Sequence, residues 1–181
     1  NSKRAGKANT GIYVFDKNIF NYTLKKSERG ELEIVDYVKM LIEDKKEINF
    51  VLVSDYWVPV AYPWDLLNAN EKIVQLAKPK TFGIVEKGAT IKGNVSVGKN
   101  TIIKSGSYIE GPVVIGEDCV IGPNCFIRAY SSIGNKSKVG NAVEIKNSII
   151  GNNTSIGHLS YVGDSIIGDN VNFGAGTITA N

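Results

Sequence analysis

The amino-acid sequence predicts a parallel β-helix built of hexapeptide repeats, preceded by a segment of an α/β domain. Three observations lead to this prediction. An aliphatic residue recurs at every sixth position from Val85 onward. Of the 19 glycines, 16 fall after residue 82. Before that point, the apolar residues instead follow the spacing of buried strands and amphipathic helices.

The hexapeptide repeat runs without a miss over its first eleven positions and resumes after each of two one-residue slips. The repeated residues are Val85, Ile91, Val97, Ile103, Ile109, Ile115, Ile121, Ile127, Ile133, Val139 and Ile145, then Ile150, Ile156 and Val162, then Ile167 and Phe173. A period of six matches neither a helix nor an alternating strand, whereas three hexapeptides complete one coil of a parallel β-helix. These side chains are therefore expected to point inward and to stack between coils. Glycine often follows them, and it suits a tight corner because it accepts a positive φ.

Small or β-branched side chains stand two positions before the repeated residue. They are Ala89, Thr101, Ser107, Cys119, Cys125, Ser131 and Ser137. At about 18 residues a coil, the repeat gives roughly five coils, in a stack about 25 Å long. The two cysteines are expected to pack inside different faces of one coil, so no disulfide is expected between them. Two free thiols fit a reducing cytoplasm.

The first 80 residues show the pattern of strand, helix, strand, helix. Apolar runs at 11–15 and 48–53 predict buried strands. Helical spacing of apolar residues behind an acidic start predicts a helix over 31–44. A second helix is expected over 63–76, which begins with a proline. Two or three strands are few for an α/β sheet, so this part is expected to be incomplete.

Composition excludes several classes of function. A net charge of +3 is too small to predict a nucleic-acid or membrane partner. No apolar run approaches the roughly 18 residues that a membrane-spanning helix needs. Two cysteines and one histidine nearly exclude a protein-only zinc site, which takes about four such ligands, or three and a water.

Six short stretches carry a family resemblance. In the first half, residues 9–15 (NTGIYVF), 30–36 (GELEIVD) and 62–70 (YPWDLLNAN) resemble the later part of a sugar-phosphate nucleotidyltransferase domain. In the second half, the stretches are 139–146 (VGNAVEIK), 157–164 (GHLSYVGD) and 172–181 (NFGAGTITAN). They resemble the acetyltransferase part of the bifunctional N-acetylglucosamine-1-phosphate uridylyltransferase and glucosamine-1-phosphate acetyltransferase family, and an archaeal-type member fits best.

The resemblance implies an architecture. Residues 81–181 are expected to form a left-handed β-helix acetyltransferase domain that is incomplete at its C-terminal end. Residues 1–80 are expected to be the C-terminal part of a Rossmann-like nucleotidyltransferase domain. The family's glycine-rich nucleotide-binding loop does not precede Asn9, so the chain is expected to be an internal fragment. In β-helix acyltransferases of this kind the site lies between coils of neighbouring subunits, so the resemblance implies a homotrimer.

The resemblance also implies two reactions in UDP-N-acetylglucosamine biosynthesis. One transfers acetyl from acetyl-CoA to the amine of glucosamine 1-phosphate or galactosamine 1-phosphate. The other transfers a nucleotidyl group from UTP or dTTP to a sugar 1-phosphate and requires Mg²⁺. The alternative is a sugar-1-phosphate nucleotidylyltransferase whose β-helix is purely structural and builds the oligomer. A non-catalytic β-helix scaffold is a further rival.

His158 is the candidate catalytic residue. It is the only histidine, and imidazole is the usual base for removing a proton from an attacking amine near neutral pH. Taken alone, a surface histidine at a coil corner is the better interpretation. The resemblance instead matches His158 to the family's general base.

Arg128 and Lys146 are the candidate phosphate ligands. They are 18 residues apart, one coil, and are expected to lie above one another. Two stacked cations without an adjacent acid suit a sugar phosphate, although two solvated surface charges are the ordinary alternative. The resemblance matches both residues to sugar-phosphate ligands.

The remaining site residues come from the resemblance. Tyr161 and Asn172 match residues that bind the sugar, although Asn172 could equally be a corner residue. Ala175 and Asn181 match the acetyl-CoA contact region, and Asn9 matches a sugar contact in the nucleotidyltransferase pocket. No metal ligand is assigned, because the chain has Pro59 where relatives carry a magnesium-binding aspartate.

Overall fold

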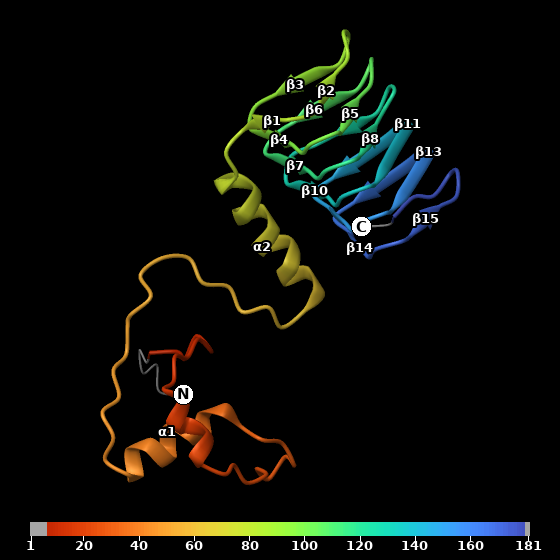
Figure 1. Ribbon diagram of the computed structural model, residues 1–181. Coiled ribbons are helices and arrows are strands. Elements are labelled where there is room, and N and C mark those ends of the chain that lie inside the picture. The colour runs from red at the N-terminus through yellow and green to blue at the C-terminus, as the bar shows by residue number, and fades with distance from the viewer. Residues whose placement is uncertain (1–6, 180–181) are drawn as a thin grey trace, which may run out of the picture. The chain divides into compact units, whose positions relative to one another are not determined.

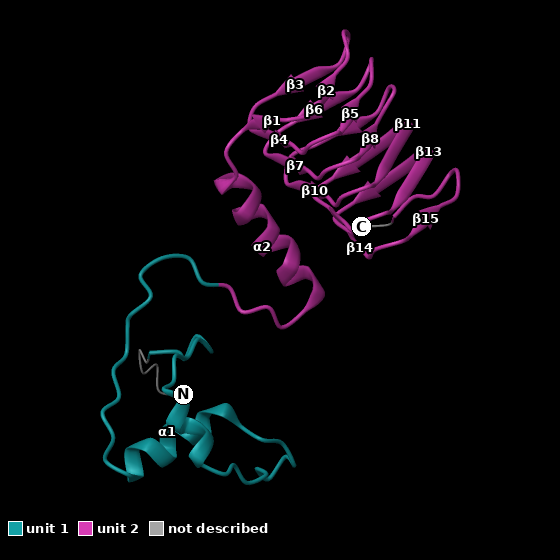
Figure 2. Cartoon of the chain, viewed as in Figure 1, with its two compact units in different colours: residues 1–57 teal, residues 58–181 magenta. Residues whose placement is uncertain are grey.

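The computed structural model describes residues 7–179 of the chain. It divides into two compact units, residues 1–57 and residues 58–181 (Figure 2). Among the described residues, no helix is both long and apolar enough to cross a membrane.

The second unit contains a parallel β-helix with three faces (Figure 1). The first face stacks β1 (Lys80–Thr81), β4 (Val95–Val97), β7 (Val113–Ile115), β10 (Ser131–Ile133), β12 (Ile149–Ile150) and β14 (Ile166–Ile167). The second face has β2 (Ile84–Val85), β5 (Ile102–Ile103), β8 (Val120–Ile121) and β15 (Asn172–Phe173). The third face has β3 (Thr90–Lys92), β6 (Tyr108–Glu110) and β9 (Phe126–Ile127). Two long strands, β11 (Lys138–Lys146) and β13 (Ser155–Gly163), bend round a corner and belong to both the second and third faces.

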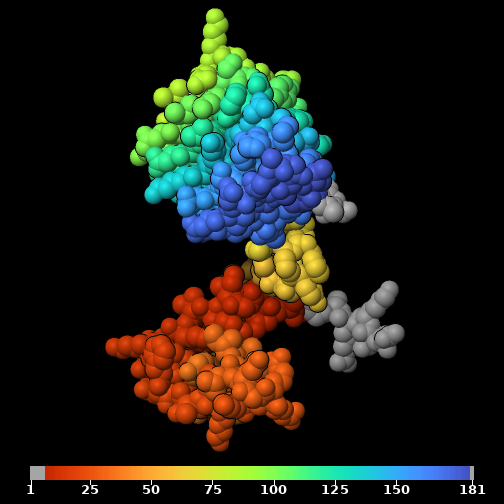
Figure 3. Space-filling model, turned by 90° about the vertical axis from the view of Figure 1, so that its right-hand side faces the viewer, coloured from red at the N-terminus to blue at the C-terminus, as the bar shows by residue number. Residues whose placement is uncertain are grey.

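The register between coils confirms the hexapeptide prediction. Val97 pairs with Ile115, 18 residues later. Ile133 pairs with Ile150, 17 residues later, because the register slips by one. In the space-filling view the coils follow one another as bands from green to blue (Figure 3).

The repeated aliphatic residues form the core of the β-helix. All those from Val97 to Val162 are at most 3% exposed. Val85, in the first coil, is 39% exposed because no earlier coil covers it. Each fully buried aliphatic side chain contributes about 1.5–3 kcal/mol of stabilisation, so the stack of equivalents holds the unit together. Cys119 and Cys125 are buried free thiols, as expected from their small positions.

The glycines after the repeated residues have two roles, and only Gly122, with a φ of +90°, has the expected one among those after Val97, Ile115 and Ile121. Gly98 and Gly116 were expected at corners with positive φ, but neither has one. A Cβ on Gly98 would overlap the carbonyl oxygen of Gly116 in the next coil. These glycines therefore allow close approach of consecutive coils. The positive-φ corner nearby is occupied instead by residues such as Asn100 and Asp118.

Helix α2 (Pro63–Leu76) has the bounds that the sequence predicted, and it packs against the β-helix. The buried Asn70 donates from Nδ2 to the carbonyl oxygen of Tyr130 at 2.8 Å, and Ser132 Oγ donates to Asn70 Oδ1 at 2.5 Å. Helix α2 therefore belongs to the same compact unit as the β-helix. The domain boundary expected near residue 80 stays a prediction, since a compact unit and a homologous domain need not coincide.

The first unit contains α1 (Ile34–Glu43) and a short 3₁₀ helix (Lys17–Asn21). Helix α1 lies within the expected range. The strands expected at 11–15 and 48–53 are wrong for this structure, because both runs are extended but form no ladder among the described residues. Val14 is 97% exposed and Val51 is 90% exposed. A strand needs a hydrogen-bonded neighbour, and an apolar run cannot supply one by itself.

Candidate functional site

Arg128 and Lys146 lie in one column along the third face of the β-helix, and Asp164 directly follows Gly163, the next residue of that column. The β9–β11 register pairs Ile127 with Ile145, which places Arg128 and Lys146 in consecutive coils. Arg128 N donates to Ile145 O at 2.8 Å, and Asp164 N donates to Lys146 O at 3.0 Å. The expected stacking of the two cations is therefore confirmed.

Each cation has a carboxylate partner, which corrects the expectation that no acid is adjacent. Arg128 Nη1 lies 3.1 Å from Glu144 Oε1, and Lys146 Nζ lies 2.9 Å from Asp164 Oδ2. Glu144 is two residues before Lys146 on β11, so alternation of side chains puts both on the outer surface. Asp164 follows β13 at the next corner and reaches back one coil.

The electrostatics of this column are coupled. A hydrogen bond from Asn147, followed by one from Lys146, holds the pKa of the Asp164 carboxyl below its usual value. The hydrogen bond with Asp164 raises the pKa of Lys146, while the charge of Arg128 acts to lower it. Both members of the Lys146–Asp164 pair are partly exposed. The site thus presents two neighbouring positive groups, each with a negative counterpart.

Two aromatic rings lie on the same face as the Arg128–Lys146 column. The Arg128 guanidinium lies 5.8 Å from the centroid of the Phe126 ring. That ring packs edge-on against Tyr108, with centroids 5.6 Å apart. A hollow of about 410 Å³ on this face is lined in part by Tyr108, Phe126 and Glu144.

Tyr161 lies on β13 opposite Glu144 of β11. A Cβ on Gly163 would come within 2.5 Å of the Tyr161 hydroxyl, so the phenol ring lies over this glycine. Gly163 is the sheet partner of Lys146. The absence of a side chain at residue 163 therefore lets the Tyr161 ring lie toward the Lys146 column.

His158 lies on β13 at the corner between the second and third faces. It pairs with Asn141 of β11, and its side chain is exposed. His158 precedes Gly163, the partner of Lys146, by five residues. The imidazole and the ammonium therefore come from opposite ends of the third face.

Asn172 and Ala175 belong to the coil after His158. Asn172 pairs with Ser155, and the bond from Gly176 N to Leu159 O at 2.9 Å sets Ala175 beside His158 in register. Both residues are exposed. The last coils thus bring His158, Tyr161, Asn172 and Ala175 to one end of the β-helix, while Asn181 lies outside the described residues.

Asn9 belongs to the first unit. Its Oδ1 accepts from Gly11 N at 2.9 Å, and its Nδ2 donates to the Tyr13 hydroxyl. These are local bonds that shape the chain around Gly11, whose φ is +76°. Asn9 thus belongs to a different compact unit from the other candidate site residues.

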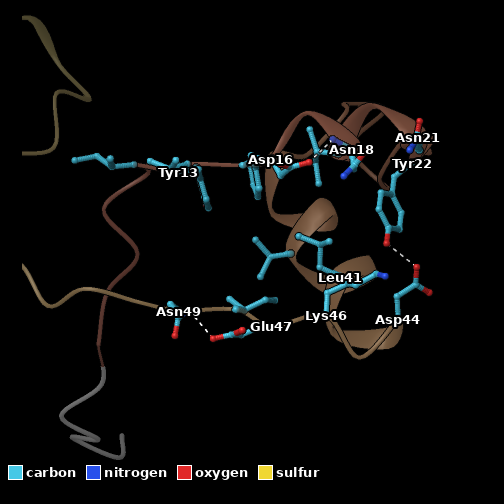
Figure 4. Close-up of a pocket in the computed structure, with 16 residues that line it drawn as sticks. Tyr13, Asp16, Asn18, Asn21, Tyr22, Leu41, Asp44, Lys46, Glu47 and Asn49 are labelled. Atoms are coloured by element: carbon cyan, nitrogen blue, oxygen red, sulfur yellow. Dashed lines mark hydrogen bonds between the residues drawn. The ribbon is translucent and has the colours of Figure 1, made fainter.

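The first unit also holds a cavity of about 820 Å³ between its extended runs and α1 (Figure 4). At one end, the Tyr22 hydroxyl donates to Asp44 Oδ2 at 2.6 Å. This hydrogen bond raises the pKa of Tyr22. No sequence motif indicated this cavity, and none of the candidate site residues lines it.

Glu144 and Asp164 are the site residues that sequence reasoning missed. Both fall inside the stretches that carried the resemblance, 139–146 and 157–164. The register slips by one after Ile145, so the residue one coil after Lys146 is Gly163, and Asp164 is in register with Asn147. Spacing alone therefore did not indicate that the Asp164 carboxylate reaches Lys146.

Two protein-family models match the chain. A nucleotidyl transferase model matches residues 2–76, and a GMPPB C-terminal domain model matches residues 109–181. A bifunctional sugar-1-phosphate nucleotidylyltransferase/acetyltransferase of Sulfurisphaera tokodaii is 42% identical over 176 residues, covering 96% of this chain and 44% of that protein. The bifunctional protein GlmU of Methanocaldococcus jannaschii is 46% identical over 175 residues, covering 96% and 43%.

The chain is a homologue of these bifunctional transferases. It spans less than half the length of the relatives it matches, in agreement with the expected fragment. The nucleotidyl transferase match covers α1 and α2, and the repeat follows it in the expected order.

A solved structure supports the fold of the second unit. The acetyltransferase domain of PglB from Neisseria gonorrhoeae, in complex with acetyl coenzyme A, has a TM-score of 0.50 and 17% identity. The alignment covers 75% of this chain and 81% of that domain. At this identity the similarity concerns the fold alone.

Proposed function

We propose that the protein containing this chain is a bifunctional transferase of nucleotide-sugar biosynthesis. The β-helix transfers acetyl from acetyl-CoA to the amine of a hexosamine 1-phosphate, glucosamine 1-phosphate or galactosamine 1-phosphate. The α/β part transfers a nucleotidyl group from UTP or dTTP to a sugar 1-phosphate. The observation that carries the acetyl-transfer half is the Arg128–Lys146 column followed, one coil later, by His158 and Tyr161 on a single strand.

Each β-helix residue has a role in the proposed acetyl transfer. His158 accepts a proton from the substrate amine as the amine attacks the thioester carbonyl, which forms the C–N bond and breaks the C–S bond. Arg128 and Lys146 bind the phosphate. Tyr161 and Asn172 bind the sugar. Backbone amides near Ala175 and Asn181 hold the thioester oxygen as it becomes anionic.

The nucleotidyl-transfer half rests on residues 2–76 and their relatives. Asn9 is proposed to contact the sugar. Mg²⁺ is proposed as the metal of this half, but the described residues contain no group of three His, Cys, Asp or Glu side chains that could hold it. The ligands of the Mg²⁺ are proposed to lie mostly outside this chain.

The proposed assembly is a cytoplasmic homotrimer. Exposed apolar and catalytic groups meet at the His158 corner, where Leu159 is 60% exposed. A site at such a corner is open on one side. A neighbouring subunit is proposed to close it and to complete the acetyl-CoA contacts.

The test is His158→Ala in the full-length protein. Loss of a general base lowers the rate of acetyl transfer by about 10²- to 10⁴-fold, and nucleotidyl transfer stays unchanged because it belongs to the other domain. Release of the CoA thiol and of pyrophosphate are measured separately. An unchanged rate of acetylation in the variant would overturn the assignment of His158.

A further inference from the structure

Asp164 is joined to the preceding coil by three hydrogen bonds. Its backbone N–H donates to Lys146 O at 3.0 Å. Its carboxylate accepts from Lys146 Nζ at 2.9 Å through Oδ2 and from Asn147 Nδ2 at 2.7 Å through Oδ1. The residue has a φ of +46°, in the left-handed region that aspartate tolerates better than most side chains. Main chain and carboxylate are thus both oriented toward the Lys146 coil.

The contacts of Asp164 restrict a side chain that is otherwise flexible. Lysine carries its charge on a four-carbon stem with several rotatable bonds. Lys146 stands one coil after Arg128, and the like charge of Arg128 opposes its ammonium. Glu144 is engaged with Arg128. Asp164 supplies the carboxylate that keeps the ammonium within the column.

The Asn147 bond gives the carboxylate a defined direction. Asn147 follows Lys146 directly and occupies a positive-φ corner at φ +42°. Its amide holds Oδ1, so that Oδ2 faces Lys146. An exposed ion pair alone contributes little, about 0–1 kcal/mol. A carboxylate whose two oxygens each accept a hydrogen bond is better suited to orienting the lysine than to stabilising the fold.

We propose that Asp164 is a positioning residue that holds the Lys146 ammonium in place for the phosphate of the acceptor sugar. This inference rests on the proposed acetyl transfer and deepens it. An ammonium has three N–H donors, so Lys146 keeps its bond to Asp164 while it donates to a phosphate oxygen. Because the lysine is already ordered, binding the phosphate costs less side-chain entropy.

The test compares Asp164→Asn with Asp169→Asn in the full-length protein. Both changes remove one carboxylate charge that bonds the preceding coil. The Asp169 carboxylate accepts a hydrogen bond of 2.6 Å from the backbone N–H of Asn152, at a different corner of the β-helix. Asp164→Asn is expected to raise the KM for glucosamine 1-phosphate by about 3- to 10-fold, while kcat and the KM for acetyl-CoA stay unchanged. Asp169→Asn is expected to change none of them.

Two further measurements separate positioning from general damage. In a Lys146→Met background, Asp164→Asn should add no further rise in KM, because its effect passes through the lysine. If Asp164→Asn does not fold, Asn147→Gly removes the amide that directs the carboxylate and keeps the backbone compatible with positive φ. It should raise the same KM, to a smaller extent.

The outcomes distinguish the two proposals. A wild-type protein that acetylates no hexosamine 1-phosphate overturns the proposed function. A wild-type protein that does so, with Asp164→Asn indistinguishable from Asp169→Asn, overturns the role of Asp164 alone. Equal effects on the KM of both substrates, or effects additive with Lys146→Met, also contradict it.

Discussion

The side-chain amide of Asn70 donates a hydrogen bond of 2.8 Å to the carbonyl oxygen of Tyr130, which joins α2 to the β-helix. Its Oδ1 accepts from Ser132 Oγ, so both ends of the amide are satisfied. Just after the C-terminal end of the helix, Asn94 Nδ2 donates to Ala77 O at 2.5 Å. Polar contacts in the middle of α2 and at its C-terminal end thus orient the helix along the first face, and the buried Val74 lies between them in sequence.

Asn70→Ala is expected to loosen α2 from the β-helix. The change leaves Tyr130 O and Ser132 Oγ without this partner in a partly buried contact, at a cost of about 1–3 kcal/mol. Native-state hydrogen exchange on the full-length protein measures this loosening as lower protection of the α2 amides. Gln75→Ala is the matched control, since Gln75 is exposed and bonds only within the helix, to Glu71. Equal protection in the two variants would contradict the docking role.

Gly140→Ala is expected to destabilise the β-helix. A Cβ there would overlap the carbonyl oxygen of Gly157 in the next coil, and overpacking of this kind costs about 1–3 kcal/mol. Gly168→Ala is the control, because a Cβ at that glycine meets nothing within 4 Å. Urea unfolding of the full-length protein should give a lower midpoint for the first variant only. Similar midpoints would show that the coils can separate at no cost.

Asp164 should make stability depend on pH in the acid range. Its folded-state pKa lies below the ordinary value of 3.8, so the unfolded chain binds the proton first as pH falls. The contribution of the carboxylate is therefore complete above the unfolded pKa and is lost as pH falls through the folded pKa. The stability difference between wild type and Asp164→Asn should be constant from neutral pH to about pH 5 and then shrink. A difference that grows on acidification would contradict the lowered pKa.

Much of the second unit could be predicted from sequence because its order is periodic. The repeat from Val85 onward fixes which side chains point inward, and each coil contacts only its neighbours. The bounds of α2 followed from Pro63 and from helical spacing. Motifs placed Arg128, Lys146 and His158 on this scaffold before any contact was known.

The remaining features depend on partners distant in sequence. The run at 11–15 has the composition of a strand, yet it forms no ladder, since pairing needs a neighbouring chain segment and composition alone does not provide it. The carboxylates beside Arg128 and Lys146 come from other turns of the β-helix. The contact between Asn70 and Tyr130 joins residues 60 positions apart.

The sequence by itself thus determined the hexapeptide architecture, the two helices and the resemblance to bifunctional transferases, because these follow from short-range periodicity and local motifs. Only the tertiary structure decided that α2 packs on the first face, that Gly98 and Gly116 serve close approach, and that Asp164 holds Lys146. The reason is physical. Spacing along the chain sets which way a side chain points, whereas the atom it meets depends on which coil lies beside it.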